Sequence, residues 1–277
     1  MTHPLVVAAL VTAATWSSWR WYAERISEAP EEGAALVLTI TFLAIAGRLR
    51  SHEPAARASV PLLPSPLLPV PLLPVALLLA VYAAGHAFLP PIARAALAVA
   101  ATLFAWHIAF FKDKPPVAFW GLAALALPVV PSLQFTLGYP MRVVSAALTV
   151  ALLQAHGFVI ARQGTFLVWR DEMVQFDAPC SGVNMLWAGL MLTLMGCTLF
   201  RLSVLKVLIA VALSTVLTIG GNVLRASSLF YVESGFIPQA PAWWHEGIGL
   251  AAFALSSLAT LWLLLQLSDR KVPSCAT

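Results

Sequence analysis

The chain has 277 residues, of which 60% are hydrophobic and only 10% are charged, and its formal net charge at pH 7 is +4. A soluble domain has about 25% charged residues, so this composition excludes a cytosolic enzyme and a disordered chain. The 16 basic residues are scattered between long apolar runs, which is typical of topology determinants and not of a nucleic-acid-binding surface. The composition therefore indicates an all-α polytopic membrane protein.

Nine apolar runs along the chain approach the length of a membrane-spanning helix. The first run lacks a charged n-region and a small-residue cleavage site, so we expect it to stay in the protein as a span. The nine runs cover about residues 3–19, 33–47, 70–89, 91–111, 116–133, 139–157, 182–200, 202–224 and 247–267.

The distribution of basic residues selects a topology for these runs. If all nine runs cross the membrane, the arginines and lysines divide 8 to 8 between the two sides. If 139–157 does not cross, they divide 9 to 7, and all four lysines lie on the side that holds both termini. We therefore predict about eight transmembrane helices, with both termini in the cytoplasm.

The segment over 139–157 differs from the other runs. Arg142 and Ser145 begin a thin polar stripe on one helical face. Gly138 and Pro140 are expected to break the helix at its start. An interfacial or re-entrant helix fits this pattern, and an ordinary packed span is the alternative.

Two stretches outside the apolar runs have a distinct composition. Residues 60–75 hold six prolines, which predicts a stiff, extended entry into the third span. Residues 158–179 contain three short strand-like strings, with turn signals at Gln163-Gly164 and at 170–172. We predict a small extracytoplasmic β-hairpin-like insert that leads directly to Cys180.

Three reactive side chains lie beside the last three apolar runs. Cys180 precedes the run over 182–200, where the positive end of a helix dipole would stabilise its thiolate. Arg225 closes the run that starts near 202, with Asn222 on the same helical face and able to orient the guanidinium. His245 precedes the last run. Taken singly, a helix start, a snorkelling arginine and an interfacial histidine are the commoner explanations.

Topology brings these three side chains together. Cys180 begins one span, Arg225 ends the next, and His245 begins the one after, so all three face the same side of the membrane. Under the predicted topology this is the extracytoplasmic side. A thiol, an imidazole and a guanidinium are the groups required for acyl transfer from a peptide bond.

The local strings around these residues carry a family resemblance across roughly the C-terminal half of the chain. The strings are Gln154-Ala155-His156-Gly157, Arg162-Gln163-Gly164-Thr165, Cys180-Ser181-Gly182, Asn222-Val223-Leu224-Arg225 and His245-Glu246-Gly247-Ile248-Gly249. In this order they resemble the exosortase/archaeosortase family of membrane-embedded cysteine transpeptidases.

The resemblance implies that Cys180 is the nucleophile, Arg225 the cation of the transition state and His245 the acid/base. Around them, the residues expected to support the site are Ser181, Gly182, Asn222 and Glu246. Residues 134–277 would then form the catalytic region. Residues 1–133 would form N-terminal transmembrane helices, which match no pattern of the family residue by residue.

The resemblance also implies the substrate and the compartment. The substrates would be secreted proteins whose C-terminal signal has a short motif, often Pro-Glu-Pro-like, followed by a hydrophobic helix and a basic tail. The enzyme would hold the substrate as a thioester on Cys180 and pass it to an acceptor amine or to water. It would be a multi-pass protein of a prokaryotic cell membrane, and the identity of the acceptor stays open.

Several other ionisable residues have alternative interpretations. His156 rivals His245 as the base, and Asp177 could orient a histidine or be a solvated loop carboxylate. His86 and His107 lie on apolar runs and are expected to be packing residues.

No metal-ligand or nucleotide-binding motif occurs, so we expect no cofactor. The alternative functions are a small-solute transporter and a non-catalytic membrane scaffold for export or polysaccharide machinery.

Overall fold

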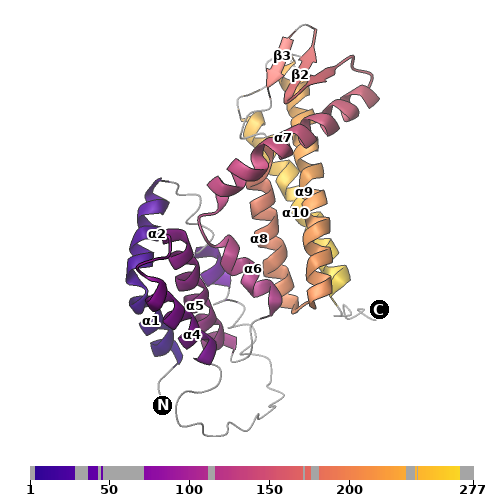
Figure 1. Cartoon of the computed structure of the whole chain (residues 1–277). Helices are drawn as coiled ribbons and strands as arrows, with labels where there is room; N and C mark the ends of the chain where they lie inside the picture. The colour runs from indigo at the N-terminus through magenta and orange to yellow at the C-terminus, as the bar shows by residue number, and fades with distance from the viewer. Residues whose placement is uncertain are drawn as a thin grey trace, which may run out of the picture. The chain divides into compact units, whose positions relative to one another are not determined.

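The computed structural model describes most of the apolar runs (Figure 1). The described residues are 4–28, 37–42, 45, 72–111, 116–170, 172–175, 181–234, 241 and 243–268. Most of the predicted run over 33–47 and residues 60–71 of the Pro-rich stretch lie outside them. The end of that stretch is not extended as predicted, because a helix begins at Leu73 and a proline is tolerated in its first turn. The chain divides into two units, Met1–Val129 and Val130–Thr277. The assignment of separate roles to residues 1–133 and 134–277 stays a prediction.

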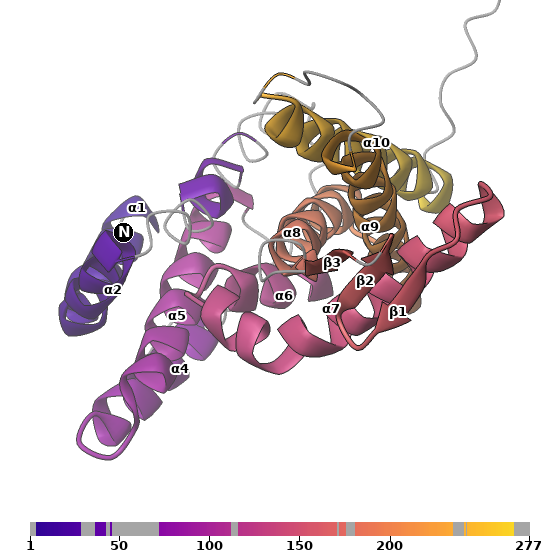
Figure 2. The same ribbon diagram turned by 90° about the horizontal axis from the view of Figure 1, so that it is seen from above.

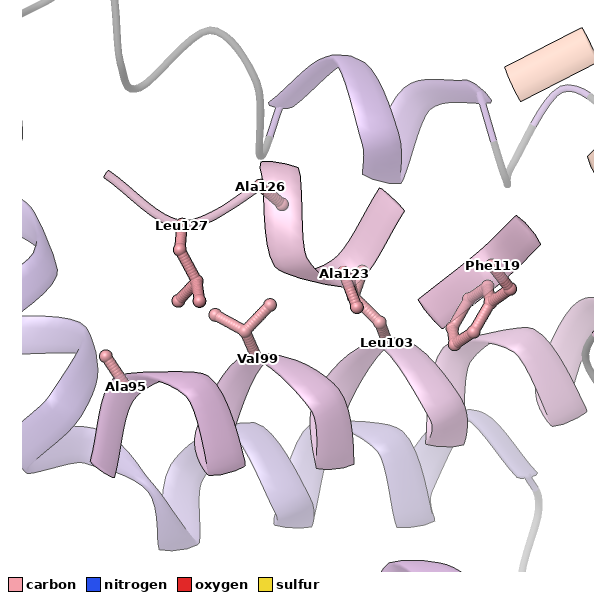
Figure 3. Packing of buried hydrophobic residues seen from close by; sticks show 7 residues of the cluster. All are labelled: Ala95, Val99, Leu103, Phe119, Ala123, Ala126 and Leu127. Carbon is pink, nitrogen blue, oxygen red and sulfur yellow. The ribbon is translucent and has the colours of Figure 1, made fainter. Parts of the chain in front are cut away.

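The first unit is helical. Its core lies between α5 (Pro91–Phe111) and α6 (Val117–Leu125), where small and branched side chains repeat at helical spacing and interlock (Figure 3). The buried cluster consists of Ala95, Val99, Leu103, Phe119, Ala123, Ala126 and Leu127. The helices are α1 (Pro4–Ala14), α2 (Trp16–Glu28), α4 (Leu73–Gly85), α5 (Pro91–Phe111) and α6 (Val117–Leu125).

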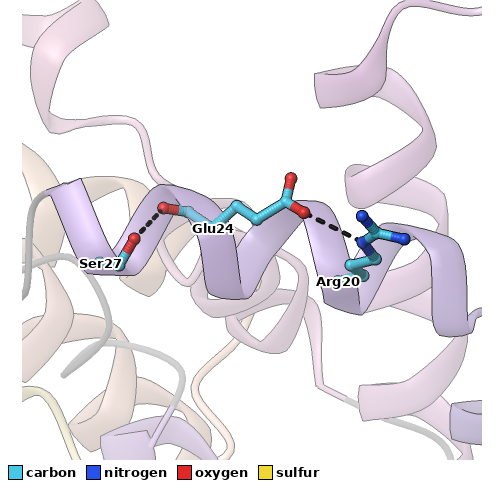
Figure 4. A network of polar contacts seen from close by, with 3 residues as sticks. All are labelled: Arg20, Glu24 and Ser27. Atoms are coloured by element: carbon cyan, nitrogen blue, oxygen red, sulfur yellow. Dashed lines mark hydrogen bonds and ion pairs between the residues drawn. The ribbon is translucent and has the colours of Figure 1, made fainter.

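The first predicted run is not one continuous helix, because the chain breaks at Thr15 between α1 and α2. The Thr15 hydroxyl donates to the carbonyl of Val11 at 3.0 Å and accepts from Trp19 Nε1 at 2.8 Å. Such side-chain bonds compete with the backbone ladder of a helix. Beyond the break, α2 is polar and carries the exposed Arg20–Glu24 ion pair at 3.0 Å (Figure 4).

The predicted run over 116–133 is wrong, because α6 ends at Leu125 and α7 begins at Val130. Pro128 has no N–H and would interrupt the hydrogen-bond ladder between them. The predicted break at Gly138 and Pro140 is wrong as well, because α7 (Val130–Ala155) continues through Pro140. A proline inside a helix removes a single backbone bond, and membrane helices tolerate it.

The second unit combines a group of three long helices, packed side by side, with a small sheet. The helices are α8 (Val183–Phe200), α9 (Val204–Glu233) and α10 (Trp244–Leu267). Figures 1 and 2 show α7 crossing these helices obliquely near the end that carries the sheet. A Cβ atom at Gly189 would lie 2.8 Å from Thr218 Oγ1, so glycine allows α8 and α9 to approach closely.

The insert before α8 is a three-stranded antiparallel sheet in the order β1-β2-β3. Its strands are β1 (Ala161–Gln163), β2 (Phe166–Trp169) and β3 (Glu172–Gln175). Gly164 has a φ of 63° in the turn between β1 and β2, which confirms the turn signal at that position. The sheet is anchored by Leu167, which is 1% exposed and clusters with Leu153 of α7 and Phe230 of α9.

Five helices of the described part of the chain are long and apolar enough to cross a membrane, namely α5, α7, α8, α9 and α10. The apolar helices within α1 and α4 are shorter. Large apolar side chains are exposed on the long helices, such as Leu205 at 68%, Leu250 at 70% and Trp262 at 63%. Exposed apolar surface of this kind fits contact with lipid. The molecule is therefore a mostly helical multi-pass membrane protein, and the predicted total of eight spans stays a prediction.

The two histidines expected to be packing residues differ. His107 is 1% exposed and packs against Phe119, with their ring centroids 5.1 Å apart, which confirms the prediction for that residue. His86 is exposed and lies in a polar cluster, so the prediction is wrong for His86. The reason is that α4 ends at Gly85 and leaves His86 in a turn outside the apolar helix.

Candidate active site

The predicted nucleophile precedes a well-defined helix start in the sequence. Cys180 itself is outside the described residues. The two residues after it are Ser181, which is 0% exposed, and Gly182, which caps α8 with a φ of 78°. The helix begins at Val183, so the backbone enters the first turn of α8 through a left-handed residue.

α7 holds this helix start through a glutamine that the sequence analysis did not single out. The Ser181 hydroxyl donates to Gln134 Oε1 at 3.3 Å and accepts from the Val183 amide at 3.3 Å. Gln134 Nε2 in turn donates to Asn184 Oδ1 at 3.2 Å. Two residues of the α8 start are thereby bonded to one side chain of α7.

Asn222 of α9 packs directly against the turn. A Cβ atom at Gly182 would lie 2.7 Å from Asn222 Cγ, so only glycine fits at this position. The positive φ of Gly182 favours glycine independently. Asn222 is 1% exposed and donates through Nδ2 to the Ser145 hydroxyl of α7 at 3.0 Å. The expected role of Asn222 in orienting Arg225 stays a prediction, and the described contacts add a role in packing against the turn after Cys180.

Gln134 and Ser145 belong to one face of α7. They are 11 residues apart, which is close to three helical turns. The polar stripe noticed in the sequence included Ser145 but began at Arg142. Extending it about two turns further back would have found Gln134, had α7 been recognised as one helix through Pro140.

Arg225 does not end its helix, contrary to prediction, because α9 continues to Glu233. Buried Val223, Ser227 and Phe230 continue the inward face at helical spacing, which explains the extra length. The side chain of Arg225 lies against α10. A Cβ atom at Gly249 would be 3.2 Å from Arg225 Nε, so the glycine makes room for the guanidinium.

His245 is in the first turn of α10, close to where the sequence analysis expected the last helix to begin. It is exposed, and it precedes Gly249 by about one helical turn. Glu246, which is also exposed, is the acidic residue of that turn. A carboxylate at a helix start is favoured by the helix dipole.

These contacts form a continuous path. Gly182 touches Asn222, Asn222 is one turn before Arg225 on α9, and Arg225 touches Gly249, one turn after His245. The starts of α8 and α10 also lie at the end of the unit that carries the sheet (Figure 1). The structure therefore brings Ser181, Gly182, Asn222, Arg225 and the first turn of α10 to one end of the helix group.

The rival histidine has a partner elsewhere. His156 follows α7, and its Nδ1 lies 2.7 Å from the hydroxyl of Tyr231. Tyr231 is six residues beyond Arg225 on α9, or about 9 Å along the helix axis. The choice of His245 over His156 as the base stays a prediction. Asp177, the other alternative, lies outside the described residues.

A groove that the sequence analysis missed lies beside the sheet. It has a volume of about 470 Å³ and is lined by Gly157, Phe158, Val159, Trp169 and Arg170. The guanidinium carbon of Arg170 lies 4.3 Å from the ring centroid of Trp169, within the range of a cation–π contact. Aromatic packing ties this wall to α9, because Trp169 and Phe158 both contact Phe230 edge-on.

No group of three or more metal-ligating side chains occurs among the residues described by the structure. The predicted absence of a cofactor stays a prediction.

Comparison with known proteins identifies a family. A family model described as transmembrane exosortase matches residues 21–262. No curated protein and no solved structure matches the chain. The family match extends the resemblance from the C-terminal half into the N-terminal helices and includes every predicted site residue. Because it covers far more than half of the 277 residues, the chain belongs to the transmembrane exosortase family.

Proposed function

We propose that this exosortase is a membrane cysteine transpeptidase that cleaves the C-terminal sorting signals of secreted proteins through a thioester on Cys180. Family membership supports the reaction class. The observation that carries the assignment of residues is the path of contacts from the α8 start, directly after Cys180, through Asn222 and Arg225 to Gly249.

The proposed chemistry uses three side chains. His245 accepts the thiol proton of Cys180, and the sulfur attacks the carbonyl carbon of the scissile peptide bond. Arg225 stabilises the negative charge that develops on the carbonyl oxygen. When the tetrahedral intermediate collapses, the C–N bond breaks and His245 gives its proton to the leaving amine. An acceptor amine or water then attacks the thioester and releases the Cys180 thiol.

The supporting residues act by fixing geometry. Ser181 is hydrogen-bonded to Gln134 of α7, and only a glycine at position 182 leaves room for Asn222 of α9. The two residues that follow Cys180 are therefore held by α7 and α9. Gly249 leaves space for Arg225 at the start of α10. Glu246 is the acidic residue of the first turn of α10, where the helix dipole favours a carboxylate and where it is available to bind a basic group of the substrate.

The proposed setting is the cell membrane of a prokaryote, with the site on the extracytoplasmic face and both termini in the cytoplasm. A substrate with a hydrophobic helix and a basic tail would insert that helix in the bilayer beside the enzyme. Its recognition motif would then lie at the membrane surface, at the level where the predicted topology puts Cys180, Arg225 and His245.

Replacement of the nucleophile tests the proposal. Cys180→Ala and Cys180→Ser should both abolish processing of a co-expressed membrane substrate that carries a C-terminal signal. The matched control is Cys197→Ala, because Cys197 is a free, fully buried thiol within α8. It should keep processing close to wild type. Normal processing by both Cys180 variants would overturn the proposal and favour a scaffold or transport role.

A further inference from the structure

A second cluster of polar side chains lies in the first unit, apart from the proposed active site. Tyr82 of α4 is bonded to two serines of α2, at 2.8 Å to Ser17 and 3.1 Å to Ser18. His86 follows α4, and its Nε2 lies 3.4 Å from the Ser17 hydroxyl. Arg94 of α5 donates through Nη1 to His86 Nε2 at 3.3 Å and to the His86 carbonyl at 3.5 Å. Three helices and one turn thus contribute to one cluster.

The cluster has more donors than acceptors. Arg94 carries five N–H groups, but the described residues accept hydrogen bonds from its Nη1 alone. Its Nε is buried and has no acceptor among them. No carboxylate of the described residues lies within ion-pairing distance of Arg94, whereas Arg20 on α2 is paired with Glu24. The positive charge of Arg94 is therefore not neutralised by the described part of the chain.

An anion would complete this set of groups. A guanidinium fork, an imidazole and hydroxyls are the side chains that bind a phosphate group, because each can donate to its oxygens. The positive end of the α5 dipole lies in the same place, since α5 begins at Pro91, three residues before Arg94. Ser17 and His86 are exposed, so a ligand can reach the cluster.

The surroundings of the cluster are apolar and exposed. Phe88, in the same turn as His86, is 88% exposed, and Ile92 at the start of α5 is 41% exposed. Val81 on α4 is 53% exposed. In a membrane protein, large apolar side chains beside a cationic turn place that turn at the boundary between headgroups and acyl chains.

We propose that Ser17, His86 and Arg94 bind the phosphate group of a membrane lipid, while buried Tyr82 donates to Ser17 and leaves the Ser17 hydroxyl proton for a phosphate oxygen. The acyl chains would lie against the exposed apolar side chains of α4 and α5. Free inorganic phosphate offers the same oxygens without the chains. The lipid is the occupant that uses both the donors and the apolar surface. This site is independent of the proposed peptide chemistry, and its loss leaves the Cys180 assignment untouched.

Binding to the purified, delipidated full chain in detergent tests this inference. The probes are dihexanoyl phosphatidic acid, dihexanoyl glycerol as a matched neutral compound, and inorganic phosphate. We expect saturable binding of the phosphatidic acid that is roughly tenfold or more tighter than that of either control, because losing either the charged hydrogen bonds or the apolar contacts weakens binding. Equal binding of the neutral compound, or equal binding of inorganic phosphate, would overturn the lipid-phosphate site.

Variants locate the binding. Arg94→Gln should weaken phosphatidic acid binding by roughly tenfold or more, whereas Arg20→Gln, which removes an exposed charge from α2, should change it by less than about twofold. Ser17→Ala, at an exposed position, serves as the second variant if Arg94→Gln does not fold, and it should weaken binding by about threefold or more. Affinity for phosphatidic acid that is unchanged in Arg94→Gln or, if that variant does not fold, unchanged in Ser17→Ala would overturn the proposal.

Discussion

The two polar clusters of this molecule, one in each unit, are built in opposite ways. At the start of α8, Ser145, Ser181 and Asn222 are each no more than 1% exposed and are bonded to side chains of other helices or packed against them. At the turn after α4, Ser17 and His86 are exposed and Arg94 keeps donors without an acceptor in the described chain. A buried, satisfied network fixes a geometry, whereas an open one with surplus donors is suited to bind a ligand.

The largest expected effect comes from adding one methyl group at the buried cluster. Gly182→Ala would place a carbon 2.7 Å from Asn222 Cγ at a φ of 78°, so the turn after Cys180 must shift. We expect substrate processing to fall by about 100-fold or more, because a displacement of about 1 Å near reacting groups has that effect. Processing rates in isolated membranes would measure it.

The control for Gly182→Ala is Gly157→Ala. Gly157 also has a positive φ, of 90°, but an added Cβ would meet nothing within 4 Å. This control therefore contains the backbone strain without the collision and should keep most of the activity. Equal losses in the two variants would mean that strain alone matters and that contact with Asn222 does not position the turn.

A smaller effect is expected where α10 meets Arg225. Gly249→Ala would place its Cβ 3.2 Å from Arg225 Nε and push the guanidinium by a few tenths of an ångström. Processing should fall by roughly threefold to tenfold. Gly247→Ala, two residues away, would meet only the ring of Trp243 at 3.4 Å and should stay near wild type. A larger loss at Gly247 than at Gly249 would contradict the packing of Arg225 on α10.

Serine substitutions compare the two clusters by stability. Ser145→Ala removes an acceptor from buried Asn222 Nδ2, so the free energy of unfolding should drop by about 1–3 kcal/mol. Ser17→Ala lies at an exposed position and should change it by less than about 0.5 kcal/mol. Thermal unfolding in detergent, followed by tryptophan fluorescence, would measure both. Similar losses in the two variants would show that the clusters do not differ in this way.

The smallest effect concerns the histidine that we do not assign as the base. Tyr231→Phe removes the 2.7 Å contact with His156 Nδ1 but leaves the aromatic packing in place. Processing should stay within about threefold of wild type, because Tyr231 lies about 9 Å along α9 from Arg225 and outside the proposed site. A loss comparable to that of His245→Ala would instead assign the proton transfer to His156.

Patterns within short stretches of the sequence predicted part of this fold correctly. The three strands of the insert and the starts of α8 and α10 follow from alternation, glycine turns and apolar runs. The family match then confirmed the resemblance that rested on strings from Gln154 to Gly249.

Features that depend on contacts between distant segments were missed. The sequence predicted a continuous run over 116–133 and a helix break at Pro140, whereas the structure has a break before α7 and a continuous helix through Pro140. The two cases were confused because proline ends some helices and is tolerated in others. The bonds from Gln134 to Ser181 and Asn184 join residues at least 47 positions apart. His86 was expected to be a packing residue because its partners Ser17 and Arg94 lie on other helices.

A covalent intermediate on Cys180 tests the central proposal most directly. The purified enzyme would react briefly with a substrate that carries a C-terminal sorting signal, and an acid quench and mass spectrometry of the cysteine-containing peptides would follow. We predict a hydroxylamine-sensitive acyl adduct on Cys180, formed from the N-terminal part of the cleaved substrate and absent in Cys180→Ala. Cleavage of the substrate without an adduct on Cys180, or with an adduct on Cys197 or Cys275 instead, would contradict the proposal.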